Sequence, residues 1–260
     1  ASPTWAKVNN RNTPVVKAVQ KIGSSVVNIN TEEVAPTRRN PFRDLRNPFF
    51  DQFFKELVPR LNNNRRSLGS GVIIHPDGYI LSNEHVVARA SSIKVTLIDN
   101  REFSARLVGA DIKSDLAVIK IESNKGLPYV KLGRSDDLMI GETVIAIGNP
   151  FGLEHTVTTG IISALHRSIK GNKNRVYRDF IQLDASINPG NSGGPLLNIN
   201  GSLIGVNTAI FKHAEGIGFA IPINKAKRII NDLIRYGKVR RGWLGISVQN
   251  MTKEMRRFFY

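Results

Sequence analysis

The sequence predicts an all-β protein with a short helix near each end, and three observations carry this prediction. Between residues 69 and 222 the chain is a succession of short, β-branched apolar runs, which is the pattern of strands. Turn signals such as Asp-Gly and Asn-Gly separate these runs. No amphipathic stretch of helix length lies between them, which argues against parallel βαβ winding. About ten to twelve strands over about 200 residues favour two small antiparallel barrels over one.

The N-terminal part is predicted from a capping signature. Thr13 is a good N-cap residue, Pro14 suits the first position of a helix, and Gly23 ends the apolar periodicity. A strand is expected over 24–31. The segment 33–66 is rich in Pro, Asn, Arg and Phe and has little periodicity, so we expect a long loop there, and long ordered loops are often functional.

The C-terminal helix is predicted from apolar residues at helical spacing. We expect Asn224 to cap it and Gly237 to end it. The apolar positions between them are Ile229, Ile230, Leu233 and Ile234.

Composition restricts the class of protein. The 260 residues include 37 Lys and Arg against 21 Asp and Glu, a formal net charge of +16, and no Cys. Cysteine nucleophiles, disulfides and cysteinyl metal sites are therefore excluded. No apolar run is long enough for a membrane-spanning helix, and the sequence begins without a signal peptide, as a mature or trimmed form would. The basic residues fall in three separated places without a nucleic-acid motif, so we expect no specific nucleic-acid binding, although a basic nucleic-acid binder remains an alternative.

The segment Gly190-Asn191-Ser192-Gly193-Gly194-Pro195 is the sharpest chemical feature. A serine hydroxyl becomes a nucleophile only when a base removes its proton and donors stabilise the oxyanion. The flanking glycines let the backbone turn tightly, so that the N–H groups of Gly190 and Ser192 can point into one small cavity. A hairpin loop rich in turn residues is the plain alternative.

Partners for this serine are found at two predicted strand ends. His85 follows an apolar strand, and Asp115 directly precedes another. The chain order His, Asp, Ser is one of the known orders of a catalytic triad. Asp111 is the main rival acid, and its surroundings indicate a solvated turn. The competing histidines are His75, His155, His166 and His213. HExxH is absent, and we expect no metal or other cofactor.

Together, several segments resemble the protease domain of the HtrA/Deg family over nearly the whole chain from about residue 13. They are 68–73, 78–87, 114–121, 146–152, 184–196 and 216–222. The resemblance implies two six-stranded trypsin-like barrels with the active site in the cleft between them. It also implies His85, Asp115 and Ser192 as the triad, and an oxyanion hole in the loop Gly190, Asn191, Ser192.

The same resemblance implies a function and a setting. It implies an ATP-independent serine endopeptidase that degrades misfolded or unfolded polypeptides in a bacterial periplasm, with an organelle as the alternative compartment. It also implies a homotrimer built through N-terminal contacts, in which Trp5 and phenylalanines near Phe42 are apolar candidates. The alternative function is a chaperone-like polypeptide-binding module whose site is mostly inactive at rest.

Substrate preference follows from the position six residues before the nucleophile, where trypsin-like cleavage after Arg or Lys needs a carboxylate. That residue is Ser186, so cleavage after Arg is disfavoured. We expect mostly aliphatic pocket walls, a preference for small aliphatic P1 side chains, and pairing of an extended substrate with 207–209. The expected substrate-binding residues are Ile204, Val206, Asn207, Thr208, Ala209 and Ile217.

Three further expectations rest on the resemblance. Arg167 matches the regulatory sensor arginine of these enzymes, with one more solvated cation as the alternative. Residues 1–240 are expected to form the protease domain, with 33–66 as its regulatory loop. Residues 241–249 resemble the opening strand of a PDZ domain, so 241–260 are expected to be the incomplete beginning of one, with an isolated amphipathic tail as the alternative.

Overall fold

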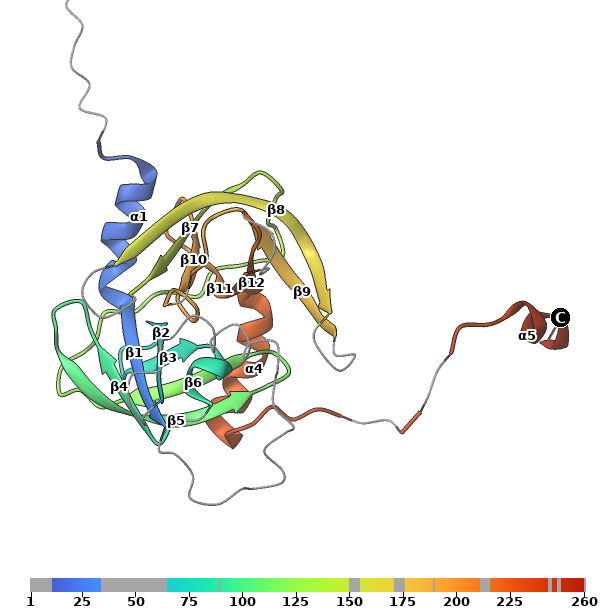
Figure 1. Cartoon of the computed structure of the whole chain (residues 1–260), viewed down its shortest axis with the longest axis horizontal. Coiled ribbons are helices and arrows are strands. Elements are labelled where there is room, and N and C mark those ends of the chain that lie inside the picture. The colour runs from blue at the N-terminus through green and yellow to red at the C-terminus, as the bar shows by residue number, and fades with distance from the viewer. Residues whose placement is uncertain are drawn as a thin grey trace, which may run out of the picture.

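In the computed structural model, which describes residues 11–33, 65–88, 90–149, 155–170, 176–188, 190–210, 216–242, 245–246 and 249–259, the strands form two closed six-stranded antiparallel barrels (Figure 1). The predicted all-β double barrel is therefore confirmed. The strand order is β1-β2-β3-β6-β5-β4 in the first barrel and β10-β11-β12-β9-β8-β7 in the second.

The strands of each barrel are consecutive in the sequence. Those of the first are β1 Val26–Glu33, β2 Arg65–Ile73, β3 Tyr79–Ser82, β4 Ser92–Thr96, β5 Glu102–Asp111 and β6 Leu116–Ile121. Those of the second are β7 Thr143–Gly148, β8 Thr156–Lys170, β9 Val176–Leu183, β10 Pro195–Asn198, β11 Leu203–Ile210 and β12 Gly218–Pro222.

An apolar core between the barrels fixes their relative position. Alternate residues of β6 point to different cores: Ala117 and Ile119 fill the first barrel, whereas Leu116 and Val118 join the core shared by both barrels. In β7, Ile145 and Ile147 enter the same shared core. Burial on both faces explains why these strands are continuous apolar runs rather than alternating ones.

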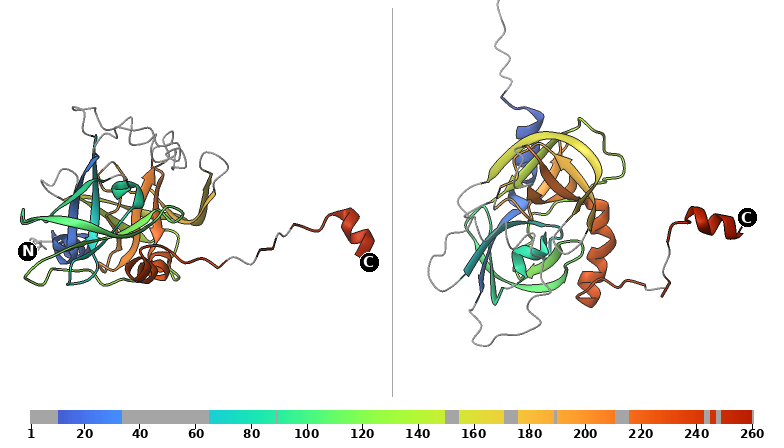
Figure 2. Two further views of the ribbon diagram at one scale, coloured as in Figure 1. Left: turned by 90° about the horizontal axis from the view of Figure 1, so that it is seen from below. Right: turned by 45° about the vertical axis from the view of Figure 1, so that its right-hand side comes forward.

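Two helices cover this junction. Helix α1 (Pro14–Ile22) begins as predicted, with the Thr13 hydroxyl accepting from the N–H of Val16 at 3.3 Å. Helix α4 (Ile223–Tyr236) packs against β5 and β6 of the first barrel and β11 and β12 of the second (Figure 2). It ends at Gly237 in the left-handed conformation, φ +70°, as predicted.

The predicted cap of α4 is wrong. The N-cap residue is Pro222, and Asn224 already lies in the first turn. Its side-chain amide instead donates to the Asp136 carboxylate at 3.0 Å, and its backbone N–H donates to the Ser135 hydroxyl at 3.1 Å. A tertiary hydrogen bond therefore occupies the side chain that local sequence suggested for capping.

The limits of the first strands also differ from the predicted ones. Strand β1 spans 26–33 rather than 24–31, because a 3-10 turn, Gly23–Ser25, follows α1. Its pairing with β2 continues to Glu33↔Arg65, so both ends of the expected loop 33–66 are strand. The remainder of that loop, and the predicted trimer contacts at Trp5 and Phe42, lie outside the described residues.

The described part of the C-terminal segment runs away from the barrels and includes the short helix α5 (Lys253–Phe259) (Figure 1). Its assignment as the opening of a PDZ domain stays a prediction. Of the described helices, none has the length and apolar character needed to span a membrane.

Candidate active site

His85 and Asp115 form a buried pair at one end of the first barrel. A one-turn helix, α3 (Glu84–Val87), follows β3 and carries the histidine. The imidazole Nδ1 lies 2.8 Å from both carboxylate oxygens of Asp115, and the backbone N–H of His85 donates to Oδ1 at 3.1 Å. The two side chains are 6% and 1% exposed. The carboxylate thus holds both the ring and the backbone of the histidine.

The β5–β6 turn positions Asp115. Asp115 has a φ of +55°, which is uncommon for a residue with a side chain. The Asn83 side-chain amide donates to its carbonyl at 2.9 Å. One residue earlier, the Ser114 hydroxyl and N–H both donate to Asp111 Oδ2, at 2.6 and 3.0 Å. Asp111 therefore closes the turn that presents Asp115.

The expectation of a solvated Asp111 is wrong. Its side chain is only 8% exposed, and Arg241, beyond α4, donates to both of its carboxylate oxygens at 2.8 and 2.6 Å. Burial raises the pKa of Asp111, but the hydrogen bonds from Arg241 and Ser114 outweigh it and hold the pKa below its usual value. The ion pair ties the segment after α4 to the turn that carries Asp115.

Arg241→Ala is expected to destabilise the protein by about 1 kcal/mol at neutral pH, since the arginine is itself half-exposed. The folded state lowers the Asp111 pKa, so the stabilisation is complete above the unfolded value of about 3.9 and is lost as the pH falls through the lower folded value. Thermal melting of Arg241→Ala and wild type at pH 7 and in strong acid measures the stability difference at each pH. The exposed Lys238→Ala is the control, and a difference between Arg241→Ala and wild type that persists in strong acid contradicts the ion-pair explanation.

Ser192 lies on the second barrel, in the turn that precedes β10. Its side chain is buried, and its hydroxyl donates to the Thr208 carbonyl on β11 at 3.2 Å. The Thr208 hydroxyl donates to Asp115 Oδ2 at 2.6 Å. Thr208 therefore connects the serine of the second barrel to the histidine–aspartate pair of the first. The structure brings the three predicted catalytic residues into one buried hydrogen-bonded cluster.

The serine loop is closely packed. Gly190 and Gly193 have φ values of +102° and +84°, which favour glycine. A Cβ on Gly193 would lie 2.2 Å from the carbonyl oxygen of Ser70 and 2.3 Å from the hydroxyl of Ser82. Asn191 uses its side chain within the loop, accepting from the Asn188 N–H at 2.8 Å and donating to the Ser186 carbonyl at 3.3 Å. The glycines thus permit a backbone approach that side chains would block.

Sequence reasoning missed the part that Thr208 plays in this cluster, because it considered the residue only for substrate binding. A register shift in the β11–β12 pairing occurs between Asn207 and Ala209. Such an irregularity redirects a side chain out of the regular alternation. The run Val206-Asn207-Thr208 gave one signal, since two polar residues follow an apolar run, and residues 203–208 are all buried.

The predicted substrate residues divide into two groups. Ile204 and Val206 are at most 1% exposed and belong to the hydrophobic cores. The Asn207 N–H and carbonyl already pair with the serine loop, at Gly194 O (2.9 Å) and Gly193 N (2.8 Å). The Ile204 and Val206 side chains and the Asn207 peptide therefore have partners within the protein, and Thr208 is buried as well, whereas Ile217 is half-buried. A substrate-binding role for the six predicted residues stays a prediction.

Arg167 lies on β8, beside β9. Its guanidinium donates to the Gln182 side chain at 2.9 Å. The β8–β9 pairing is irregular on both sides of this position, and the neighbouring His166 has a φ of +54°. Its regulatory role stays a prediction.

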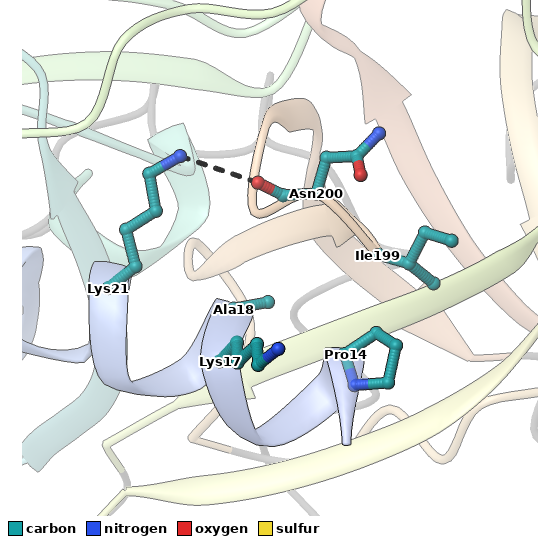
Figure 3. Close-up of a pocket in the computed structure, with 6 residues that line it drawn as sticks. All are labelled: Pro14, Lys17, Ala18, Lys21, Ile199 and Asn200. Carbon is teal, nitrogen blue, oxygen red and sulfur yellow. Dashed lines mark hydrogen bonds between the residues drawn. The ribbon is translucent and has the colours of Figure 1, made fainter. Parts of the chain in front are cut away.

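A pocket opens on another part of the surface, between α1 and the turn from β10 to β11 (Figure 3). Lys21 reaches across it to the Asn200 carbonyl at 3.4 Å. None of the predicted catalytic residues lines it. Among the residues that the structure describes, no cluster of three or more His, Asp or Glu side chains could hold a metal ion.

Comparisons with known proteins agree with this architecture. A family model described as a trypsin-like peptidase domain matches residues 69–206. A putative serine protease HhoB of Synechocystis is 48% identical over 93% of this chain and 58% of its own length. A probable periplasmic serine endoprotease, DegP-like, of Ectopseudomonas mendocina is 44% identical over 93% of this chain and 53% of its own length.

Solved structures extend the comparison. An HtrA-type protease, AlgW, solved with a tripeptide is 43% identical, with a TM-score of 0.75 over 94% of this chain and 71% of its own. The chain belongs to the trypsin-like peptidase family and, within it, to the HtrA-type serine proteases. It spans somewhat more than half the length of the curated relatives described above.

Proposed function

We propose that the chain is the catalytic part of a serine endopeptidase in which Ser192 is the nucleophile, His85 the general base and Asp115 the residue that orients the imidazole. The observation that carries this proposal is the cluster in which Thr208 joins Ser192 to the His85–Asp115 pair. The buried aspartate accepts from Nδ1, which leaves Nε2 as the basic nitrogen.

The chemistry follows from these positions. His85 takes the proton of Ser192 as the hydroxyl attacks a peptide carbonyl, and it later gives that proton to the leaving amine. Asp115 stabilises the imidazolium formed between these steps. The N–H groups of Gly190 and Ser192 stabilise the oxyanion, and the loop that contains Asn191 holds them.

One feature favours a second function. The Ser192 hydroxyl donates to the Thr208 carbonyl, so its proton is engaged by the backbone. We infer that this is a resting arrangement, in which the hydroxyl must turn about the Cα–Cβ bond before His85 can take its proton. A protein that stayed in the resting state would hold polypeptides in the manner of a chaperone without cutting them.

A serine-directed fluorophosphonate distinguishes these functions. An active endopeptidase is expected to become covalently labelled, with the modification mapped to Ser192 by mass spectrometry of proteolytic fragments. Heat-denatured protein is the control for nonspecific reaction. Polypeptide binding without labelling at Ser192 supports the holding function, and labelling at another serine contradicts the nucleophile assignment.

Substrate preference gives a separate prediction. Ser186 offers no carboxylate for an Arg side chain, and its carbonyl already accepts from Thr158 and Asn191. Peptides with Val or Ala at P1 are therefore expected to show higher kcat/KM than otherwise identical Arg peptides. A fluorogenic assay measures both, and faster cleavage after Arg contradicts the proposed pocket.

The names of the relatives support a setting for this activity. Several are described as probable periplasmic serine endoproteases, and a periplasmic role in degrading misfolded or unfolded polypeptides is proposed on that basis. The AlgW structures were solved with a tripeptide or a decapeptide, which fits a polypeptide substrate. A homotrimer and regulation through Arg167 are proposed from the family resemblance.

A further inference from the structure

Ser70, on β2 of the first barrel, donates two hydrogen bonds to the serine loop of the second barrel and accepts another from Asn149, the residue after β7. It is fully buried. Its N–H donates to the Ser192 carbonyl at 2.9 Å, its hydroxyl donates to the Gly190 carbonyl, and the same hydroxyl accepts from the Asn149 N–H at 2.8 Å. One residue therefore contacts the carbonyl groups on both sides of Asn191.

These contacts restrict the backbone that carries the proposed oxyanion donors. Holding the Gly190 carbonyl orients the 190–191 peptide plane, and holding the Ser192 carbonyl orients the 192–193 plane. The Ser192 N–H lies between these two planes. Gly190 has the φ of +102°, in a region open to glycine, whose backbone has more freedom than that of any other residue. The hydroxyl of Ser70 removes part of that freedom.

The direction of the hydroxyl is itself determined by the second barrel. The Asn149 N–H occupies a lone pair of Ser70 Oγ, so the hydroxyl proton is left for the Gly190 carbonyl. The peptide of Asn149 is held in turn, because its carbonyl accepts from the Asn28 side chain on β1 at 2.7 Å. A side chain in this position must accept and donate at once, which neither alanine nor an apolar residue can do.

We propose that Ser70 is a positioning residue for the oxyanion hole, acting through the Gly190 carbonyl from the opposite barrel. The inference rests on the proposed function, since it assigns Ser70 a part in the reaction at Ser192. In this role Ser70 does not contact the substrate. Its hydroxyl keeps the loop in the orientation in which the Gly190 and Ser192 N–H groups stabilise the transition state.

Ser70→Ala tests this. Losing an oxyanion donor outright lowers kcat by about 10²–10³-fold, so loosening the loop is expected to lower kcat by about 10-fold or more, with little change in KM. The affinity for a peptide boronate, which mimics the tetrahedral intermediate, is expected to fall by a similar factor. Binding of an uncleaved peptide to Ser70→Ala/Ser192→Ala is expected to equal its binding to Ser192→Ala.

Ser82→Ala is the matched control. Ser82 is equally buried, and its hydroxyl donates to the Ser70 carbonyl at 2.7 Å rather than to the serine loop. It is expected to affect kcat and boronate affinity much less than Ser70→Ala at a similar loss of thermal stability. Equal effects of the two variants, or wild-type kcat and boronate affinity in Ser70→Ala, overturn the proposal.

A second variant covers a failure to fold. If Ser70→Ala does not melt cooperatively, Ser70→Cys is used instead. Its thiol keeps an atom in place of the hydroxyl oxygen but is a weaker hydrogen-bond donor. The kcat of Ser70→Cys is therefore expected to lie between those of wild type and Ser192→Ala. Wild-type kcat in Ser70→Cys overturns the proposal. Fluorophosphonate labelling of the wild type distinguishes a failure of the Ser70 proposal from a failure of the proposed function. Labelling at Ser192 with an unaffected Ser70→Ala rejects only the role of Ser70, whereas absence of labelling in the wild type rejects the proposed function.

Discussion

Ser192→Ala is expected to lower peptide-bond cleavage by about 10⁴-fold or more while the protein stays folded. The substitution removes the oxygen that attacks the peptide carbonyl, and no acyl intermediate can form without it. It also removes the hydrogen bond to the Thr208 carbonyl, so a loss of about 1 kcal/mol in stability is expected. Casein cleavage and thermal melting measure the two effects separately.

Ser202→Ala is the control for this substitution. Ser202 lies ten residues further on, in the turn between β10 and β11, where its backbone N–H donates to the Asn198 side chain at 3.0 Å. That hydrogen bond survives in alanine, so cleavage is expected to stay at the wild-type rate. Cleavage that survives unchanged in Ser192→Ala would show that another residue is the nucleophile.

Asp115→Asn is expected to lower kcat by about 10⁴-fold with little effect on KM, because it changes the imidazole tautomer. The carboxylate accepts from the His85 backbone, the His85 ring and the Thr208 hydroxyl. An amide has one acceptor oxygen, and its NH₂ group would donate to Nδ1. The ring proton then moves to Nε2, which can no longer accept the proton of Ser192.

The exposed Asp137→Asn controls for the loss of one negative charge. It is expected to leave kcat unchanged, since Asp137 lies in an exposed part of the chain between β6 and β7. Steady-state kinetics on one fluorogenic peptide compares the variants. A kcat of Asp115→Asn close to that of wild type would mean that the imidazole is oriented without this carboxylate.

Local patterns predicted most of the fold correctly. The β-branched runs and turn dipeptides indicated the strands, and Thr13-Pro14 indicated the start of α1, since these signals depend on neighbouring residues alone. The same reasoning failed for Asn224, because its side chain found a tertiary partner in Asp136. It failed for Asp111 because Arg241, 130 positions away, buries and pairs the carboxylate.

The candidate site was predicted unevenly. His85, Asp115 and Ser192 each follow from a residue type at a strand end or in a glycine-rich turn, and the family resemblance supported all three. The resemblance did not indicate that Ile204 and Val206 are core residues. That outcome depends on which face of β11 meets the interior. Residues 203–208 of this strand are all buried, so they show no alternation from which the inward face can be recognised.

By itself, the sequence determined the two barrels and the three chemical groups, since strand pattern, glycine content and residue type are local properties. Only the tertiary structure decided how those groups are joined. Thr208 reaches Asp115 across 93 positions and Ser70 reaches Gly190 across 120. The physical reason is that hydrogen bonds act over a few ångströms, and the apolar core between the barrels is what brings these distant polar groups within that range.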